Sequence, residues 1–314
     1  MPTFFTGPSR SYTSNMEFST PVIIEPSPWK IEPCERMLFV GSCFADNMGR
    51  RFTEEKFRAV VNPYGVMYNP ASIVHTVQRL IDDGAMPFAP DEQGTAVFTL
   101  GTNHVYILKQ TGEIVDNCAK RPQRLFEEQA LNIDACANYL RQAIDLIHAA
   151  YPKVRFILTV SPIRYRKYGY HGSQLIKATL LLAIDQLLVA LARRDAGPSP
   201  TSTIGTVTPV TASYFPSYEI VNDELRDYRF YQPDMLHPSD QAVSYIYERM
   251  AACYFSADTH RFLQAWAPLK AALAHRPFDP DSEAYQTFRA NTLKAIAALQ
   301  QRYPQLTIDN TSPC

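Results

Sequence analysis

The chain has 314 residues, 46% of them hydrophobic, and a formal net charge of −1 at pH 7. This length allows one large domain with an extension, or two smaller domains. Without a basic excess or a polybasic block, the sequence gives no indication of nucleic acid or a membrane surface as a partner. We therefore expect a soluble protein that acts on small or neutral substrates.

Three features of the sequence indicate the cellular compartment of the protein: the amino-terminal segment, the longest apolar stretch and the cysteines. Residues 1–20 are polar and lack the apolar region of a secretory signal. Residues 178–192 are apolar but shorter than a membrane span and contain Asp185, which predicts a buried helix. The cysteines show no Cys-x-x-Cys pair and no zinc spacing, so we expect a cytoplasmic protein with reduced thiols and without a metal or other cofactor. The six positions are Cys34, Cys43, Cys118, Cys136, Cys253 and Cys314.

Strand and helix patterns alternate along most of the chain. The apolar run 37–40 predicts a buried strand that ends at Gly41, and a helical pattern follows over residues 44–57. Further strands are expected at 58–62, 96–100, 104–109, 154–160 and 203–208, and further helices at 69–80, 134–150 and 173–194. This alternation predicts an α/β protein whose parallel sheet is covered by helices on both faces.

The pattern changes after residue 255. Residues 262–275 and 282–302 are helical, a proline-containing segment joins them, and no strand pattern accompanies them. We therefore predict an α/β domain over residues 1–255 and a helical extension, residues 256–314, packed on its core.

The first candidate site is Gly41-Ser42-Cys43, at the turn from the first strand into a helix. Active sites of parallel sheets collect at the carboxyl ends of strands, and a helix amino terminus stabilises a thiolate or an oxyanion. Cys43 or Ser42 could therefore be a nucleophile. The alternative, and by itself the commoner case, is that Ser42 caps the helix and Cys43 is a small buried apolar residue.

The second candidate is Asp234-Met235-Leu236-His237-Pro238, before a helix that Pro238 could begin. At this spacing Asp234 can hold one ring nitrogen of His237 while the other nitrogen faces a nucleophile. The alternative is that Asp234 is a helix cap and His237 an ordinary surface residue. A metal site would need further ligands at matching spacing, and the sequence offers none.

Two glycine-containing turns are candidate oxyanion donors. Gly65 follows a predicted strand, and Gly101-Thr102-Asn103 follows another. A backbone N–H at a glycine and an asparagine amide are donor types that stabilise a tetrahedral oxyanion. The alternative is that both are ordinary loop residues.

Residues 39–45, Phe-Val-Gly-Ser-Cys-Phe-Ala, resemble the signature of the GSCFA family. Later segments are similar to it as well, at 61–65, 68–70, 160–162, 214–238 and 275–278, so the resemblance covers nearly the whole chain. That family is grouped with the SGNH, or GDSL-like, hydrolases. The resemblance implies a flavodoxin-like three-layer α/β/α sandwich and the activity of an esterase, lipase or acyltransferase.

The resemblance also implies a catalytic triad. Asp234 and His237 match the closing Asp-x-x-His block of the superfamily. The superfamily's Gly-Asp-Ser is replaced here by Gly-Ser-Cys, so a gapless match puts Cys43, and not Ser42, in the nucleophile position.

In the implied oxyanion hole the chain departs from the superfamily's pattern a second time, at His104. Gly65 matches the superfamily's oxyanion glycine, and Asn103 matches its Gly-x-Asn-Asp block, with His104 in place of the second acid. The donors to the oxyanion would be the Cys43 N–H, the Gly65 N–H and the Asn103 amide.

Our hypothesis is ester hydrolysis or acyl transfer through a covalent intermediate on a small ester, such as an acylated carbohydrate. The chief alternative is a non-catalytic module that keeps the fold and holds a carbohydrate or acyl ligand, which the departures at Cys43 and His104 favour. A third hypothesis is a scaffold whose helical segment, residues 262–302, binds a partner.

Overall fold

The computed structural model describes residues 19–116, 118, 120–195 and 208–308. Its centre is a parallel sheet of five strands in the order β2-β1-β3-β7-β8. The strands are Arg36–Gly41 (β1), Arg58–Val61 (β2), Gly94–Leu100 (β3), Val154–Val160 (β7) and Ala212–Tyr214 (β8). This order is that of a flavodoxin-like doubly wound sheet, as expected.

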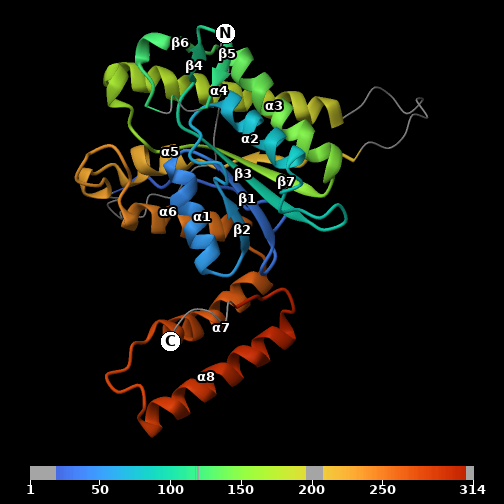
Figure 1. Ribbon diagram of the computed structural model, residues 1–314, viewed down its shortest axis with the longest axis vertical. Helices are drawn as coiled ribbons and strands as arrows, with labels where there is room; N and C mark the ends of the chain where they lie inside the picture. The colour runs from blue at the N-terminus through green and yellow to red at the C-terminus, as the bar shows by residue number, and fades with distance from the viewer. Residues whose placement is uncertain (1–18, 117, 119, 196–207, 309–314) are drawn as a thin grey trace, which may run out of the picture.

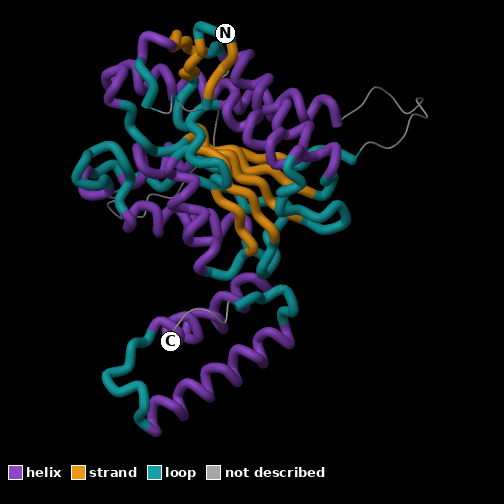
Figure 2. The backbone as a smooth tube through the Cα atoms, viewed as in Figure 1, coloured by secondary structure: helices purple, strands orange, loops and turns teal. Residues whose placement is uncertain are grey.

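Helices cover both faces of the sheet (Figure 1). One face carries Pro70–Asp82 (α2), Ile133–Ala150 (α3) and Gly169–Asp195 (α4), and the other carries Cys43–Glu54 (α1) and Asp240–Tyr254 (α6). Figure 2 shows the strands between the two helical layers. The predicted three-layer α/β/α sandwich is confirmed.

The side chains of β1 explain why its sequence is continuously apolar. Leu38 and Val40 point into the core beneath α2, α3 and α4, whereas Met37 and Phe39 point into the core beneath α1 and α6. Successive strand residues face opposite sides, so a strand buried on both sides needs an apolar residue at every position.

Helix α4 is the one described helix that is long and apolar enough to cross a membrane, by length and composition only. In this fold its inner face packs in the core, where Ile176, Leu180, Ile184 and Leu187 are buried. The other face of the run is open, since Leu182 and Val189 are exposed, so the helix is buried on one side only and not throughout as we expected.

A small antiparallel sheet stands apart from the main one, in the order β5-β4-β6. Its strands are His104–Leu108 (β4), Glu113–Val115 (β5) and Phe126–Ala130 (β6). The sequence predicted the first of these as a strand but not its partners. The strand predicted at 203–208 falls almost wholly outside the described residues, and the last strand of the main sheet is β8. Short helices lie at Gln123–Leu125 (η1), Arg166–Tyr168 (η2), Ser217–Glu219 (α5), Ile220–Leu225 (η3) and Tyr228–Phe230 (η4).

Two helices form the carboxyl-terminal extension, Ala257–Ala274 (α7) and Glu283–Arg302 (α8), and they lie beyond the end of α1 (Figure 1). Phe262 and Trp266 of α7 pack with Leu299 of α8 in a separate apolar cluster. The Trp266 indole N–H also donates to the Glu54 carbonyl oxygen at 3.2 Å. Helix α7 therefore joins α8 to the α/β body.

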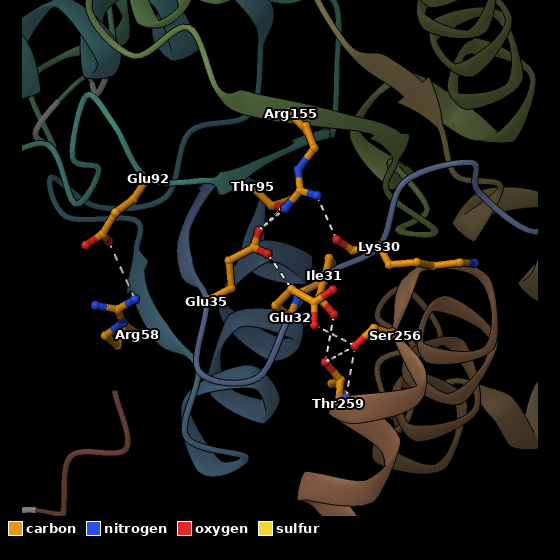
Figure 3. A network of polar contacts seen from close by, with 10 residues as sticks. All are labelled: Lys30, Ile31, Glu32, Glu35, Arg58, Glu92, Thr95, Arg155, Ser256 and Thr259. Atoms are coloured by element: carbon orange, nitrogen blue, oxygen red, sulfur yellow. Dashed lines mark hydrogen bonds and ion pairs between the residues drawn. The ribbon is translucent and has the colours of Figure 1, made fainter. Parts of the chain in front are cut away.

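A buried ion pair ties the amino ends of the strands together (Figure 3). The Arg155 guanidinium donates to the Glu35 carboxylate at 2.6 Å, and both side chains are less than a tenth exposed. The same carboxylate accepts hydrogen bonds from the Thr95 hydroxyl at 2.6 Å and the Glu32 N–H at 3.0 Å. The network holds β1, β3 and β7 at the edge of the sheet opposite to the candidate site.

Candidate active site

A cleft of about 490 Å³ opens at the carboxyl ends of the strands. Helix α1 leaves β1 on one face of the sheet, and α2 enters β3 on the other, so β1 and β3 flank the point where the winding reverses. Ligands of doubly wound folds bind outside the strands at such a switch point. Cys43 after β1, Thr102 after β3 and His237 all line this cleft.

Ser42 is the helix cap that the sequence allowed as its alternative role. Its hydroxyl accepts the Phe44 N–H at 3.2 Å and lies 2.6 Å from the Ser161 hydroxyl. The residue is fully buried, and its own N–H donates to Thr99 at the end of β3. These contacts fix Ser42 below the cleft, so its oxygen is not presented to a ligand.

Cys43 is the first residue of α1 and reaches the cleft with a partly buried side chain. Burial and the nearby Asp46 carboxylate raise the pKa of the thiol to about 11. The N–H groups of Cys43 and Phe44 and the Lys177 ammonium act in the opposite direction and lower this pKa. At neutral pH the sulfur is therefore a thiol that needs a base to become a nucleophile.

Asp234 orients His237 through a short-range turn. One carboxylate oxygen accepts the N–H groups of Leu236 and His237 at 2.8 and 3.0 Å, and the other lies 2.5 Å from His237 Nδ1. These hydrogen bonds hold the pKa of Asp234 at about 2, so its ionised form favours the tautomer with hydrogen on Nδ1. Helix α6 begins later, with Ser239 as its cap, so neither Asp234 nor Pro238 starts it.

Arg164 attaches this turn to the wall of the cleft. Its N–H donates to the Leu236 carbonyl at 3.0 Å, and its guanidinium donates to the Met235 carbonyl at 3.1 Å. The turn that carries His237 is thus held from outside as well as by Asp234.

Cys43 and His237 share the cleft without a described hydrogen bond between them. Among the described residues, no hydrogen bond joins Cys43 Sγ to His237, and His237 Nε2 has no partner there. Contacts between a catalytic base and its nucleophile are often long before substrate binds. The structure thus brings Cys43 and His237 to one cleft, with Asp234 hydrogen-bonded to the histidine, and leaves Ser42 beneath it.

The contacts of Gly65 and Asn103 give no support to the oxyanion role that the family resemblance implies for them. The Gly65 N–H donates to the Asn62 carbonyl at 2.8 Å within its own turn. The Asn103 amide donates to the Leu131 carbonyl at 2.7 Å, which anchors the end of β6, and its buried oxygen has no partner. Neither residue lines the cleft.

Two other residues that line the cleft offer donors that the sequence did not single out. Asn69 caps α2 by accepting the Ser72 N–H at 2.9 Å, and its amide nitrogen has no partner in the described part of the chain. Burial raises the pKa of Tyr165, so its hydroxyl stays protonated, and it too lacks a described partner. The Asn-Pro step at 69–70 indicated a helix start, but nothing local showed which way the free amide would point.

Aromatic and charged side chains form the walls of the cleft. His104 stacks on Tyr168 with ring centroids 4.0 Å apart. Lys167 is neutralised by Glu128 at 2.8 Å, whereas no described carboxylate pairs with Arg164. The cleft therefore presents flat apolar faces beside polar groups, a combination suited to a small organic ligand.

No described group of three or more His, Cys, Asp or Glu side chains is placed to hold a metal ion.

The strand order and the cleft at the switch point define a flavodoxin-like α/β protein with a candidate site at the carboxyl ends of its strands. The chain belongs to the GSCFA family, which matches residues 36–93 and 89–250. Residues 266–311 match the GSCFA domain protein, C-terminal domain. A search of curated proteins found no match.

Two solved structures share limited similarity with the chain. A structure from Streptococcus pneumonia whose name refers to a platelet activating factor is 15% identical, with a TM-score of 0.41, over 70% of this chain and 84% of that one. A carbohydrate esterase family 3 structure from Talaromyces cellulolyticus is 10% identical, with a TM-score of 0.35, over 68% of this chain and 93% of that one. TM-scores this low do not establish a common fold, so the architecture stated above is based on the topology of this chain.

Proposed function

We propose that this protein is an SGNH-type hydrolase or acyltransferase that forms a covalent acyl intermediate on Cys43. The observation that supports this proposal is that Cys43, at the amino terminus of α1, and His237, oriented by Asp234, line one cleft at the switch point of the sheet. Few structural roles require a cysteine, a histidine and its carboxylate at one solvent-accessible position.

In this mechanism His237 Nε2 accepts the thiol proton as Cys43 Sγ attacks the acyl carbon. The new C–S bond converts the carbonyl oxygen to an oxyanion. Collapse of that intermediate breaks the bond to the leaving alcohol, which takes the proton from His237. Water or a second alcohol then attacks the thioester carbon while His237 accepts its proton. Collapse of this second intermediate breaks the C–S bond, releases the acid or the new ester, and returns the proton from His237 to the sulfur.

The oxyanion needs donors that are not already engaged. The Cys43 N–H belongs to the first turn of α1, where helix N–H groups lack internal partners and the macrodipole favours negative charge. We assign the Asn69 amide nitrogen as a second donor in place of Asn103, because it lines the cleft and is otherwise unpaired among the described residues. Each such donor contributes about 3 kcal/mol to transition-state stabilisation.

The nucleophile in this proposal is Cys43 rather than Ser42. Ser42 Oγ is buried and hydrogen-bonded to the Phe44 N–H and the Ser161 hydroxyl, whereas Cys43 lines the cleft. The high pKa of the Cys43 thiol is compatible with this role, because the histidine removes the proton as the bond forms rather than beforehand.

The walls of the cleft support a small ester as substrate. Tyr68 and Tyr165 form an edge-to-face pair above the site, with ring centroids 6.5 Å apart. Such aromatic faces pack well on a sugar ring or an acyl chain. An acylated carbohydrate or a similar small ester is therefore the substrate class that we propose.

The test is hydrolysis of a panel of small esters, for example p-nitrophenyl acetate and an acetylated monosaccharide. Cys43→Ala and His237→Ala should each lower kcat/KM by at least about a hundredfold, and intact mass should reveal an acyl adduct lost in Cys43→Ala. Cys118→Ala is the matched control, because Cys118 lines the same cleft and should be dispensable. Full turnover by His237→Ala on every accepted ester would refute the mechanism.

A second candidate is a binding module that holds an acylated carbohydrate without cleaving it. The absence of a described hydrogen bond between Cys43 and His237 favours it. This alternative predicts that an ester protects Cys43 from alkylation and remains intact, whereas the enzyme proposal predicts that the ester is consumed.

A further inference from the structure

Helix α4 contains a fully buried lysine that the proposed mechanism does not use. Lys177 is 1% exposed and lies between Ile176 and Leu180 on the inner, largely apolar face of the helix. Fully buried lysines are rare unless they are paired, because desolvation disfavours the ammonium. No described carboxylate pairs with Lys177.

The lysine is bound instead by two backbone carbonyls at the ends of strands. Its ammonium donates to the carbonyl of Gly101, just after β3, at 2.8 Å and to that of Ser161, just after β7, at 2.9 Å. The faces of Tyr165 and Tyr218 lie 5.6 and 5.9 Å from Nζ. The positive charge therefore lies beneath the carboxyl edge of the sheet, under the floor of the cleft.

The same two residues support the turn that carries Cys43. The Ser161 hydroxyl lies 2.6 Å from that of Ser42, and the side of Gly101 that lacks a side chain faces the Tyr165 hydroxyl, the Tyr68 carbonyl and the Ser42 Cβ. Among the described residues, the charge of Cys43 acts against burial and raises the pKa of Lys177, and the Lys177 ammonium lowers the pKa of Cys43 in turn. Lysine and cysteine are thus linked both by the backbone and by charge.

We infer that Lys177 is a positioning residue of the Cys43 site, whose buried ammonium holds the Gly101 and Ser161 loops in place and stabilises negative charge that develops on the sulfur. This inference rests on the proposed role of Cys43. A protonated lysine under the turn favours a thiolate, and hence its attack on an acyl carbon, without contacting the substrate.

A structural role alone would make different predictions. Two carbonyls can be joined by any well-placed donor, so the loops would be held equally well by a neutral amide. Burial lowers the pKa of Lys177 to about 7, so retaining a lysine there makes the fold less stable at neutral pH than a neutral group would. A charge that serves Cys43 gives a reason for a lysine at this position.

The test is the pH profile of Cys43 alkylation by iodoacetamide, followed by peptide mass spectrometry with Cys118 as the internal reference. Lys177→Met should slow alkylation of Cys43 by about tenfold at about pH 6.5, where most of the wild-type lysine is charged, and the difference should shrink above about pH 8 as the wild-type lysine loses its proton. Lys177→Gln should do the same, and it serves if methionine does not fold, because it retains donor hydrogens but no charge. Unchanged Cys43 profiles in both folded variants would overturn the inference.

Leu180→Ala is the matched control, since it leaves a cavity one turn further along the same face of α4 and keeps the charge. Its Cys43 profile should match that of the wild type even where its melting temperature falls. Slower alkylation of Cys43 in Leu180→Ala would mean that loosened packing, and not charge, sets the reactivity of the thiol. That result would overturn the inference.

Alkylation needs no substrate, so this experiment is independent of the ester assay. If Lys177→Met shifts the Cys43 profile while His237→Ala keeps full turnover, the lysine acts on Cys43 and the acyl mechanism fails. If His237→Ala is inactive and both Lys177 variants leave the profile unchanged, the acyl mechanism stands and the inference fails.

Discussion

Removal of the Glu35 charge should destabilise the fold strongly without affecting the cleft. In Glu35→Gln the Arg155 guanidinium keeps its buried position and loses its only described carboxylate partner, and the hydrogen bonds from Thr95 and Glu32 are weakened. Breaking a buried pair from one side costs about 3–5 kcal/mol, because a buried charge is left uncompensated. We expect a loss of this size in the free energy of unfolding.

The measurement is urea denaturation followed by circular dichroism, with Glu92→Gln as the control. Glu92 pairs with Arg36 at 2.9 Å near the same edge but is 51% exposed, so its removal should cost no more than about 1 kcal/mol. A double variant, Glu35→Gln with Arg155→Met, should recover part of the loss because no buried charge remains. Equal losses for Glu35→Gln and Glu92→Gln would refute the reasoning that burial sets the magnitude.

Three further predictions concern the site. Asp234→Asn should lower kcat by about a hundredfold or more because the His237 tautomer is no longer fixed. In the wild type the pKa of Asp234 is about 2, so the pH–rate profile should show no loss of activity from protonation of Asp234 above about pH 4. Ser42→Ala should cost about 1 kcal/mol of stability in urea denaturation as a lost helix cap, and it should keep its ester turnover. Loss of turnover with an unaltered alkylation rate of Cys43 would contradict the assignment of Cys43 as the nucleophile. In the folded protein the pKa of Lys177 is depressed from 10.5 to about 7, so the unfolded chain binds more protons between these pH values. The free energy of unfolding of the wild type should therefore rise from about pH 7 to 9 relative to that of Lys177→Met. Parallel curves for the two proteins would contradict the burial argument.

The elements of the main sheet were predictable because their patterns are local. β1 is apolar from Met37 to Val40, and β7 is apolar except at Arg155 and Thr159, as is typical of strands buried on both faces. The prediction placed both strands to within a residue at either end. β6 was missed because its sequence, Phe-Glu-Glu-Gln-Ala, has little strand propensity and is mostly exposed. It forms a strand through its pairing with β4, which no local pattern records.

In the candidate site, too, the features that depend on neighbouring residues were predictable from the sequence and the others were not. The Asp234–His237 contact depends on a spacing of three residues, so it could be anticipated from the sequence alone. The placement of Cys43 at the start of α1 follows from the strand, glycine and cap around it. The oxyanion donors could not be predicted from the sequence, because a family resemblance gives the position of a residue in the chain and not the direction of its side chain.

The sequence by itself thus determined the α/β class, the strand-to-helix turn at Cys43 and the paired Asp234 and His237, because each depends on residues within a few positions of one another. Only the tertiary structure decided that Cys43 and His237 share a cleft, that Asn69 lines it while the Asn103 amide donates to Leu131, and that Lys177 lies beneath it. The physical reason is that these relations join segments up to nearly two hundred residues apart, and the packing of helices on the sheet sets them rather than any local preference.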